Sequence, residues 1–215
     1  MEKIETLKKL ATFIKAIAAG LAISVGATAY MACDVKIIGA LLFTAGLFTI
    51  CFLDLKLYTG AIGYLLDMKR PWECAVIWCG NAVGCAMGGI LLRYSLPSVA
   101  QVATKITATK LEIPLLKGAI LGIFCGMLMY IAVHNYKKNS STVAKIVGIL
   151  VCIPAFIICG FEHCIANVVY FTMGISNVSQ LPRILLFMLV VSLANGVGAI
   201  AFRKISMAFV KEKVE

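Results

Sequence analysis

The amino-acid sequence predicts an all-α integral membrane protein with six transmembrane helices. Of its 215 residues, 61% are hydrophobic and only 14% are charged, and the mean hydropathy of +0.97 lies outside the usual range of soluble globular domains. The apolar residues form long runs, and at about 20 residues per crossing this length accommodates roughly six helices with short connections. We therefore expect one membrane domain over residues 1–215, with no room for a soluble catalytic domain.

The first half of the chain contains three of the expected crossings. The first covers residues 13–31 and follows a charged segment without a small-residue cleavage site, so we expect no removed signal peptide. The second apolar run, residues 37–52, stops at a charged segment and resumes at residues 61–66. Irregular backbone is tolerated in a bilayer only where protein buries it or where it lines a cavity, so we expect a broken helix at a candidate site. The third crossing covers residues 72–92.

The second half follows the longest polar connection, residues 93–117, part of which we expect to form a short surface helix. A fourth crossing at residues 118–133 precedes an apolar region, residues 143–175, that is too long for one span. A proline, a glycine and a Glu-His pair divide this region, which predicts a second broken helix. The sixth crossing covers residues 184–202 and ends in two basic residues.

Matching segments in the two halves predict an internal repeat. The third and sixth crossings carry Asn81-Ala-Val-Gly84 and Asn195-Gly-Val-Gly198, and the second and fifth regions are the interrupted ones. Because each half holds three crossings, the second half is expected to be inverted relative to the first. We therefore expect inverted repeats over about residues 10–95 and 115–205, with their broken helices meeting near the midplane of the membrane.

The distribution of basic residues predicts the orientation in the membrane. With six crossings, both termini and the connections after crossings two and four share one side, and that side holds the excess of Lys and Arg. Its basic residues are Lys3, Lys8, Lys9, Lys69, Arg70, Lys137, Lys138, Arg203, Lys204, Lys211 and Lys213. We expect both termini in the cytoplasm and the chain in the inner (cytoplasmic) membrane. Topology also explains the net charge of +10, and the sequence lacks the basic surface interleaved with aromatic residues that indicates nucleic-acid binding.

The stretch from Gly160 to Asn167 places Glu162, His163 and an amide inside a deeply apolar run. Ionisable side chains at membrane depth cost several kcal/mol unless they face a cavity or a partner, so this stretch indicates a transport or ligand site. A hydrogen-bonded packing histidine is the alternative. We expect Glu162 and Asn167, together with Asn81 and Asn195, mainly to satisfy hydrogen bonds between helices and along the backbone.

The nine cysteines are scattered and contain no CxxC pair, which favours small buried packing residues. A metal or thiol-redox enzyme using Cys159, His163 and Cys164 is a different possibility, but two adjacent ligands at a helix interruption make a poor three-ligand site. The sequence also contains no P-loop or dinucleotide-binding fingerprint. We expect neither an enzyme activity nor a cofactor or metal. A structural or scaffolding membrane protein is the remaining possibility.

The segment Gly160-Phe-Glu-His-Cys-Ile-Ala-Asn167 is similar to the Gly-Phe-Glu-His-Ser-Ile-Ala-Asn signature of the formate/nitrite transporter family, and the resemblance covers nearly the whole chain. Members of this family are six-span pentameric channels with an aquaporin-like fold that pass small monovalent anions or their conjugate acids. The resemblance therefore implies a homopentamer in the lipid bilayer. It also implies a pore in which His163 faces Thr59.

The family's spacing implies further pore positions, whose residues alone would be ordinary packing or solvated side chains. Phe43 and Phe156 fall at the outer constriction and Lys110 at the outer vestibule, where it would attract anions. The positions at or near the inner constriction are Leu47, Leu57, Tyr58 and Met129. His163 would attract the anion as an imidazolium, or protonate it so that a neutral molecule crosses the phenyl rings.

Three positions depart from the pattern of formate channels. Lys56 replaces a glutamate before the Leu-Phe-Thr loop, Gly126 replaces an asparagine of the inner gate, and Cys164 replaces the serine of the signature. The altered loop most resembles the hydrosulfide subgroup of the family, so we expect hydrosulfide as the substrate, with formate or nitrite as the alternatives. Lys56 has a second interpretation, as a lysine that extends to the cytoplasmic surface.

Overall fold

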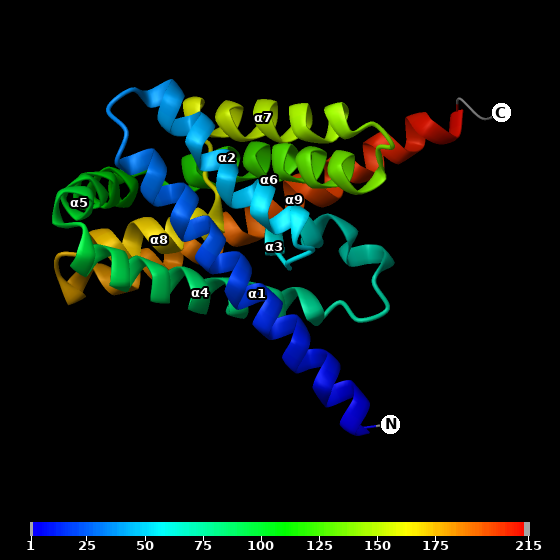
Figure 1. The fold of residues 1–215 in the computed structure, drawn as a ribbon, viewed down its shortest axis with the longest axis horizontal. Helices are drawn as coiled ribbons and strands as arrows, with labels where there is room; N and C mark the ends of the chain where they lie inside the picture. Colours follow the sequence, from blue (N-terminus) through cyan, green and yellow to red (C-terminus); the bar gives the residue numbers. More distant parts are fainter. Residues whose placement is uncertain (1, 213–215) are drawn as a thin grey trace.

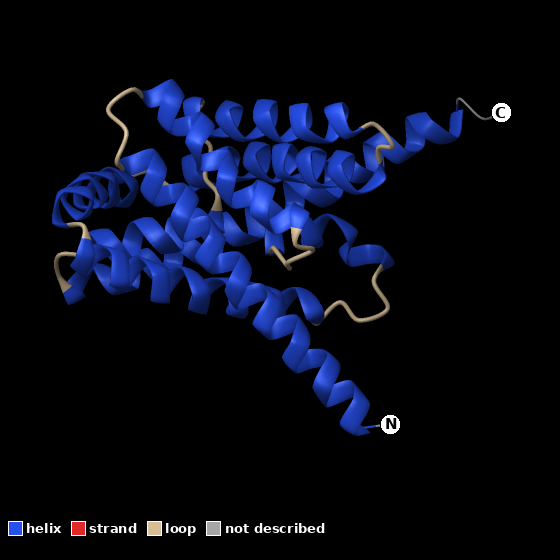
Figure 2. Ribbon diagram, viewed as in Figure 1, coloured by secondary structure: helices blue, strands red, loops and turns tan. Residues whose placement is uncertain are grey.

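The computed structural model describes the backbone of residues 2–212 and the side chains of residues 5–209, so Lys3, Lys211 and Lys213 lie outside the described side chains. Every regular element in this part of the chain is a helix, which confirms the all-α prediction (Figure 2). The elements are α1 (Glu2–Met31), α2 (Lys36–Phe52), α3 (Tyr58–Ala61), η1 (Ile62–Asp67), α4 (Glu73–Ser95), α5 (Pro97–Glu112), α6 (Leu115–Lys138), α7 (Thr142–Ile158), α8 (Cys164–Gly174), η2 (Val178–Gln180) and α9 (Leu181–Glu212).

Four helical stretches of the described chain are long and apolar enough to cross a membrane: Glu5–Met31, Glu73–Ser95, Leu115–Lys138 and Val178–Phe209. Helices α2, α7 and α8 are also apolar but shorter. Helix α9 continues well beyond the expected end of the last crossing at residue 202, because residues 203–212 contain no glycine or proline to stop it. Figure 1 shows α5 at one end of the bundle, whereas α1 starts and α9 finishes at the other end.

Helices α2 and α7 have the same length, 17 residues, and end in the same way. The N–H of Leu55 and the N–H of Phe161 each donate, at 2.9 Å, to the carbonyl five residues earlier. The residue before each of them adopts a left-handed conformation, with φ of 47° at Asp54 and 69° at Gly160. This arrangement satisfies the last carbonyls of each helix and turns the chain away from the helix axis. Two extended segments follow and lead into α3 and α8.

An asparagine on a facing helix holds each extended segment. Asn81 Oδ1 of α4 accepts from the Tyr58 N–H at 2.8 Å, and Asn195 Oδ1 of α9 accepts from the Cys164 N–H at 2.9 Å. Each amide nitrogen donates two bonds of 2.8 Å, one to a carbonyl of the neighbouring long helix and one to a carbonyl of the extended segment. Both asparagines are fully buried. The two polar side chains therefore pair backbone groups of the extended segments that no helix pairs.

The long helices pack as two equivalent pairs, α1 with α4 and α6 with α9. Gly20 of α1 lies against the carbonyl of Asn81, and Gly126 of α6 lies against the carbonyl of Asn195. A Cβ added at either glycine would overlap that carbonyl, so the missing side chain allows the two backbones to approach closely. The family resemblance implies an inner-gate position for Gly126, whereas the structure places it at this helix contact.

Candidate functional site

His163 and Thr59 meet where the two extended segments lead into α8 and α3. The Nε2 atom of His163 lies 3.0 Å from Thr59 Oγ1, and the two residues are only 2% and 0% exposed. His163 is also the N-cap of α8, because its Nδ1 accepts from the Ala166 N–H at 3.0 Å. Since Nδ1 is the acceptor, we assign the proton of the neutral ring to Nε2, which then donates to the Thr59 hydroxyl.

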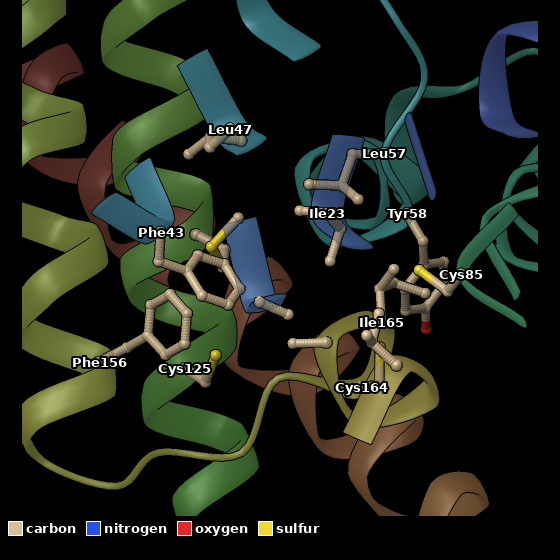
Figure 3. Packing of buried hydrophobic residues seen from close by; sticks show 14 of the residues in the cluster. Ile23, Phe43, Leu47, Leu57, Tyr58, Cys85, Cys125, Phe156, Cys164 and Ile165 are labelled. Atoms are coloured by element: carbon tan, nitrogen blue, oxygen red, sulfur yellow. The ribbon is translucent and has the colours of Figure 1, made fainter. Parts of the chain in front are cut away.

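Two phenylalanine rings form an apolar layer beside this imidazole. The rings of Phe43 and Phe156 meet edge to face, with centroids 5.8 Å apart, and the Phe156 ring stacks on that of His163 at 5.6 Å. Figure 3 shows the two phenyl rings facing each other with Cys125 alongside. Both phenylalanines are at most 3% exposed. The layer therefore covers one face of the imidazole with aromatic carbon.

A cavity of about 370 Å³ opens on one side of this layer, between α5 and the segment from α7 to α8. Glu162 and Lys110 form a nearly buried ion pair in its wall, with 2.6 Å between Nζ and Oε2 and side-chain exposures of 14% for Lys110 and 3% for Glu162. The same carboxylate oxygen accepts from Asn167 Nδ2 at 2.8 Å. Asn167 Oδ1, which is buried, has no hydrogen-bond partner within the described chain. Lys110 is therefore neither freely solvated nor a lone cation.

We expect that replacing Glu162 with glutamine will lower the free energy of unfolding by about 3 kcal/mol, because the Lys110 ammonium loses its counter-charge while nearly buried. The double variant Lys110→Met/Glu162→Gln is expected to recover most of this loss, since it removes both charges. Thermal unfolding of the purified protein in detergent measures both effects. A single variant as stable as the wild type would contradict the buried ion pair.

A second cavity, of about 290 Å³, lies near the opposite end of α7. Helix α7 contributes Lys145 of its first turn to this cavity and Ile157 of its last turn to the cavity described above. Lys56 and Lys137 also line the second cavity, and Leu57 lies on its wall. Lys145 and Ile157 lie about 18 Å apart along α7. Phe156 and His163 line the first cavity and Leu57 lines the second, whereas Phe43 and Thr59 line neither.

Three residues that line the second cavity were not predicted from the sequence to belong to the functional site. Lys145 is a single cation near the start of an apolar helix. Lys137 is used only to predict the orientation in the membrane, and Asp54 belongs to the charged segment that ends the second apolar run. The sequence carries a partial signal for Asp54 and Lys56, because both fall in the charged segment between two apolar runs. No sequence signal brings Lys137 and Lys145 to them, because these residues come from different helices.

The remaining predicted pore residues lie in the core or at helix contacts. Leu47 and Met129 are at most 1% exposed and lie in the core. Leu57 and Tyr58 diverge, because the Tyr58 hydroxyl donates to the Ser192 carbonyl of α9 at 3.0 Å (Figure 3). The resemblance puts Tyr58 at the inner constriction, whereas its phenol in this structure connects α3 to α9. Cys164 is the first residue of α8 and is fully buried.

The metal-enzyme alternative has no geometric support in the described residues. No group of three or more His, Cys, Asp or Glu side chains in this part of the chain is arranged to hold a metal ion. Cys159 is exposed, whereas His163 and Cys164 are buried.

Comparisons with known proteins identify similar channels. The formate channel FocB of Escherichia coli (strain K12) is 25% identical over 199 residues, which cover 81% of this chain and 71% of FocB. Among solved structures, an FNT family ion channel has a TM-score of 0.84 at 20% identity and covers 97% of this chain and 93% of its own. A pentameric formate channel with formate bound has a TM-score of 0.78 at 23% identity and covers 97% and 98%. These two structures show the shared fold.

The relatives are channels and transporters, which is consistent with the expectation that the chain is not an enzyme. The family model described as formate/nitrite transporter matches residues 1–209. Because this match spans almost all of the sequence, the chain belongs to the formate/nitrite transporter family.

Proposed function

We propose that this protein is a channel for small monovalent anions or their conjugate acids, with His163 at the centre of the pore. The observation that carries the proposal is the buried contact between His163 Nε2 and Thr59 Oγ1, which lies between two cavities and beside a phenyl layer. The proposed path runs from the cavity beside Lys110, past Phe43 and Phe156, to the imidazole and hydroxyl, and then past Leu57 to the lysine-lined cavity. Leu47 and Met129 are the proposed packing residues around the inner part of this path.

The proposed architecture is a single channel domain over residues 1–215 with six crossings, in which α2 with α3 and α7 with α8 form the two broken ones. The equal lengths of α2 and α7, their matching ends and the matching bonds of Asn81 and Asn195 support inverted repeats over about residues 10–95 and 115–205. We further propose a homopentamer in the inner membrane. The basic end of the bundle, where α1 starts and α9 finishes, would face the cytoplasm.

The hydrogen bonds of His163 favour a neutral imidazole over an imidazolium. Its Nδ1 accepts from the Ala166 backbone N–H, and protonation of Nδ1 would place two hydrogens against each other and remove the cap of α8. Nε2–H, in contrast, can turn from Thr59 towards a passing molecule as a donor. We therefore assign His163 the role of a hydrogen-bond donor at the narrowest point, and assign protonation of the anion to the wider cavity outside it.

The physical requirement on the substrate is that it loses its charge before it meets the phenyl layer. A bare anion in an apolar throat carries a large desolvation penalty, whereas its conjugate acid carries little. Hydrosulfide meets this requirement, because it is small and becomes neutral on gaining one proton, and the Lys56-Leu57-Tyr58-Thr59 loop resembles that of the hydrosulfide subgroup. Formate or nitrite is the second candidate, favoured by the formate channel among the relatives.

Flux measurements in proteoliposomes test the substrate assignment. We expect hydrosulfide to cross faster than formate, nitrite, chloride or acetate, and we expect its flux to rise as the pH falls, because the fraction of neutral acid increases. Liposomes without protein give the background for the neutral molecule. Faster flux of formate or nitrite would reassign the substrate, and no protein-dependent flux of any of these anions would overturn the channel proposal.

A further inference from the structure

A basic pocket of about 540 Å³ lies beside the proposed pore, between the first turns of α1 and the turn that precedes α4, and shares Lys56 with the second cavity. Five cations and one carboxylate contribute to its wall. They are Lys8, Lys15, Lys56, Lys69, Arg70 and Glu73. The cations come from three separate segments of the chain, so the fold, rather than a run of lysines in the sequence, assembles the pocket.

The charges of this basic pocket are only partly balanced. Lys15 and Lys56 both contact Asp54 Oδ2, at 3.3 and 3.6 Å. Arg70 contacts Glu73 at 3.6 Å and Glu5 at 4.0 Å. Two cations are left over.

The remaining cations, Lys8 and Lys69, have no ion pair or hydrogen bond with another described residue. Both are exposed. The basic pocket therefore carries two positive charges in excess and has room for an anion.

The position of the basic pocket along α1 corresponds to the edge of a bilayer. At 1.5 Å per residue, Lys15 lies about 24 Å and Lys8 about 35 Å from Met31, the last residue of α1. The hydrocarbon core is about 30 Å thick, so the basic pocket straddles its boundary when Met31 lies at the other boundary. Trp72, which precedes the pocket residue Glu73, lies with its ring 4.6 Å from the Lys9 ammonium, and tryptophan is enriched at the membrane interface.

An apolar face of α1 adjoins the basic pocket. Leu7, Leu10 and Ile14 are 56%, 53% and 56% exposed, and their helical positions lie on a different side of α1 from Lys8 and Lys15. The same two turns of helix thus present a cationic side to the pocket and an apolar side to the surroundings. A ligand that combines a negative group with hydrocarbon chains matches both sides.

We propose that the basic pocket binds the phosphate headgroup of an anionic phospholipid, whose acyl chains lie along Leu7, Leu10 and Ile14. Basic pockets at the cytoplasmic end of membrane helices hold such headgroups through the ammonium and guanidinium donors, and the surface charge of the lipid adds to the attraction. The cations of the basic pocket that lack partners supply the charge. A soluble phosphate compound shares the headgroup chemistry but leaves the apolar face of α1 without a function.

The test measures lipid binding by the full-length protein. Purified protein in a neutral detergent is titrated with phosphatidylglycerol or with phosphatidylcholine, and native mass spectrometry counts the bound lipid. We expect tighter binding of phosphatidylglycerol. We expect the double variant Lys8→Gln/Lys69→Gln to weaken it roughly 30-fold, since each basic residue near an anionic lipid surface contributes about fivefold. Both lysines are exposed, so this variant is expected to fold, and its thermal unfolding checks that it does.

The matched control is Lys117→Gln/Lys138→Gln, which removes the same charge at exposed positions outside the basic pocket. We expect it to bind phosphatidylglycerol like the wild type. Equal loss in both double variants, or no loss in Lys8→Gln/Lys69→Gln, would overturn the site. If inorganic phosphate or glycerol phosphate bound as tightly as phosphatidylglycerol at the same phosphate concentration, the lipid assignment would be overturned. Because the readout is binding, it does not depend on whether the protein conducts anions.

Discussion

Replacing His163 with alanine is expected to lower the flux of the permeant anion roughly 10- to 100-fold, because the narrowest part of the proposed pore loses its only imidazole donor. A buried polar group that loses its hydrogen-bond partner costs about 1–3 kcal/mol, which corresponds to a loss of this order. The measurement is stopped-flow flux into proteoliposomes that contain equal amounts of correctly folded protein. We expect the loss at every pH, because the neutral ring acts as a donor rather than as the source of the proton.

His163→Asn is the matched control for folding. Asparagine is among the best N-cap residues, so its side chain preserves the bond to the Ala166 N–H while it removes the imidazole that faces Thr59. We expect this variant to unfold at nearly the wild-type temperature but to conduct as poorly as His163→Ala. Wild-type flux with an unchanged pH profile in His163→Ala would remove the residue from the centre of the mechanism.

Replacing Asn195 with alanine is expected to destabilise the protein by about 3 kcal/mol or more. The change leaves the Cys164 N–H without its acceptor and the carbonyls of Gly122 and Glu162 without their shared donor. Each buried polar group left without a partner costs about 1–3 kcal/mol, and no water reaches the membrane interior to compensate. Thermal unfolding in detergent and the yield of folded protein measure the effect.

Asn81→Ala provides an internal check, because Asn81 makes the equivalent bonds in the first half of the chain. We expect a loss of similar size. Asn177→Ala is the control, since Asn177 is exposed and caps only the short η2 helix, and we expect a loss below about 1 kcal/mol. If both Asn81→Ala and Asn195→Ala were as stable as the wild type, the hydrogen bonds of these amides would not stabilise the extended segments.

The cavities illustrate why part of the candidate site escapes prediction from sequence. Glu162 stands out in an apolar run, but its partner Lys110 is 52 residues away on helix α5, and nothing in the local pattern joins them. Lys137 and Lys145 likewise meet Lys56 only because the ends of α6 and α7 pack against the segment after α2. Sequence patterns predict which residues are buried and where helices end. An ion pair between distant segments depends instead on how the helices pack against one another.

Tyr58 shows the same limit within a single motif. The family resemblance places both Leu57 and Tyr58 at or near the inner constriction, but successive residues entering a helix point in different directions. Thr59 turns towards His163, while the Tyr58 phenol reaches the Ser192 carbonyl. The identity of a residue in the motif therefore does not determine which way its side chain faces.

The amino-acid sequence alone predicts a helical membrane protein, the ends of its apolar runs, and the exceptional polar stretch that contains His163. These properties follow from composition and local pattern, since a polar group inside the bilayer costs free energy unless it has a hydrogen-bond partner or faces a cavity. The packing of the helices, in contrast, determines that His163 caps α8 through the Ala166 N–H, that Lys110 is paired with Glu162, and that Gly126 lies at a helix contact. The last two contacts join residues far apart in the chain, and their geometry comes from the close packing of whole helices.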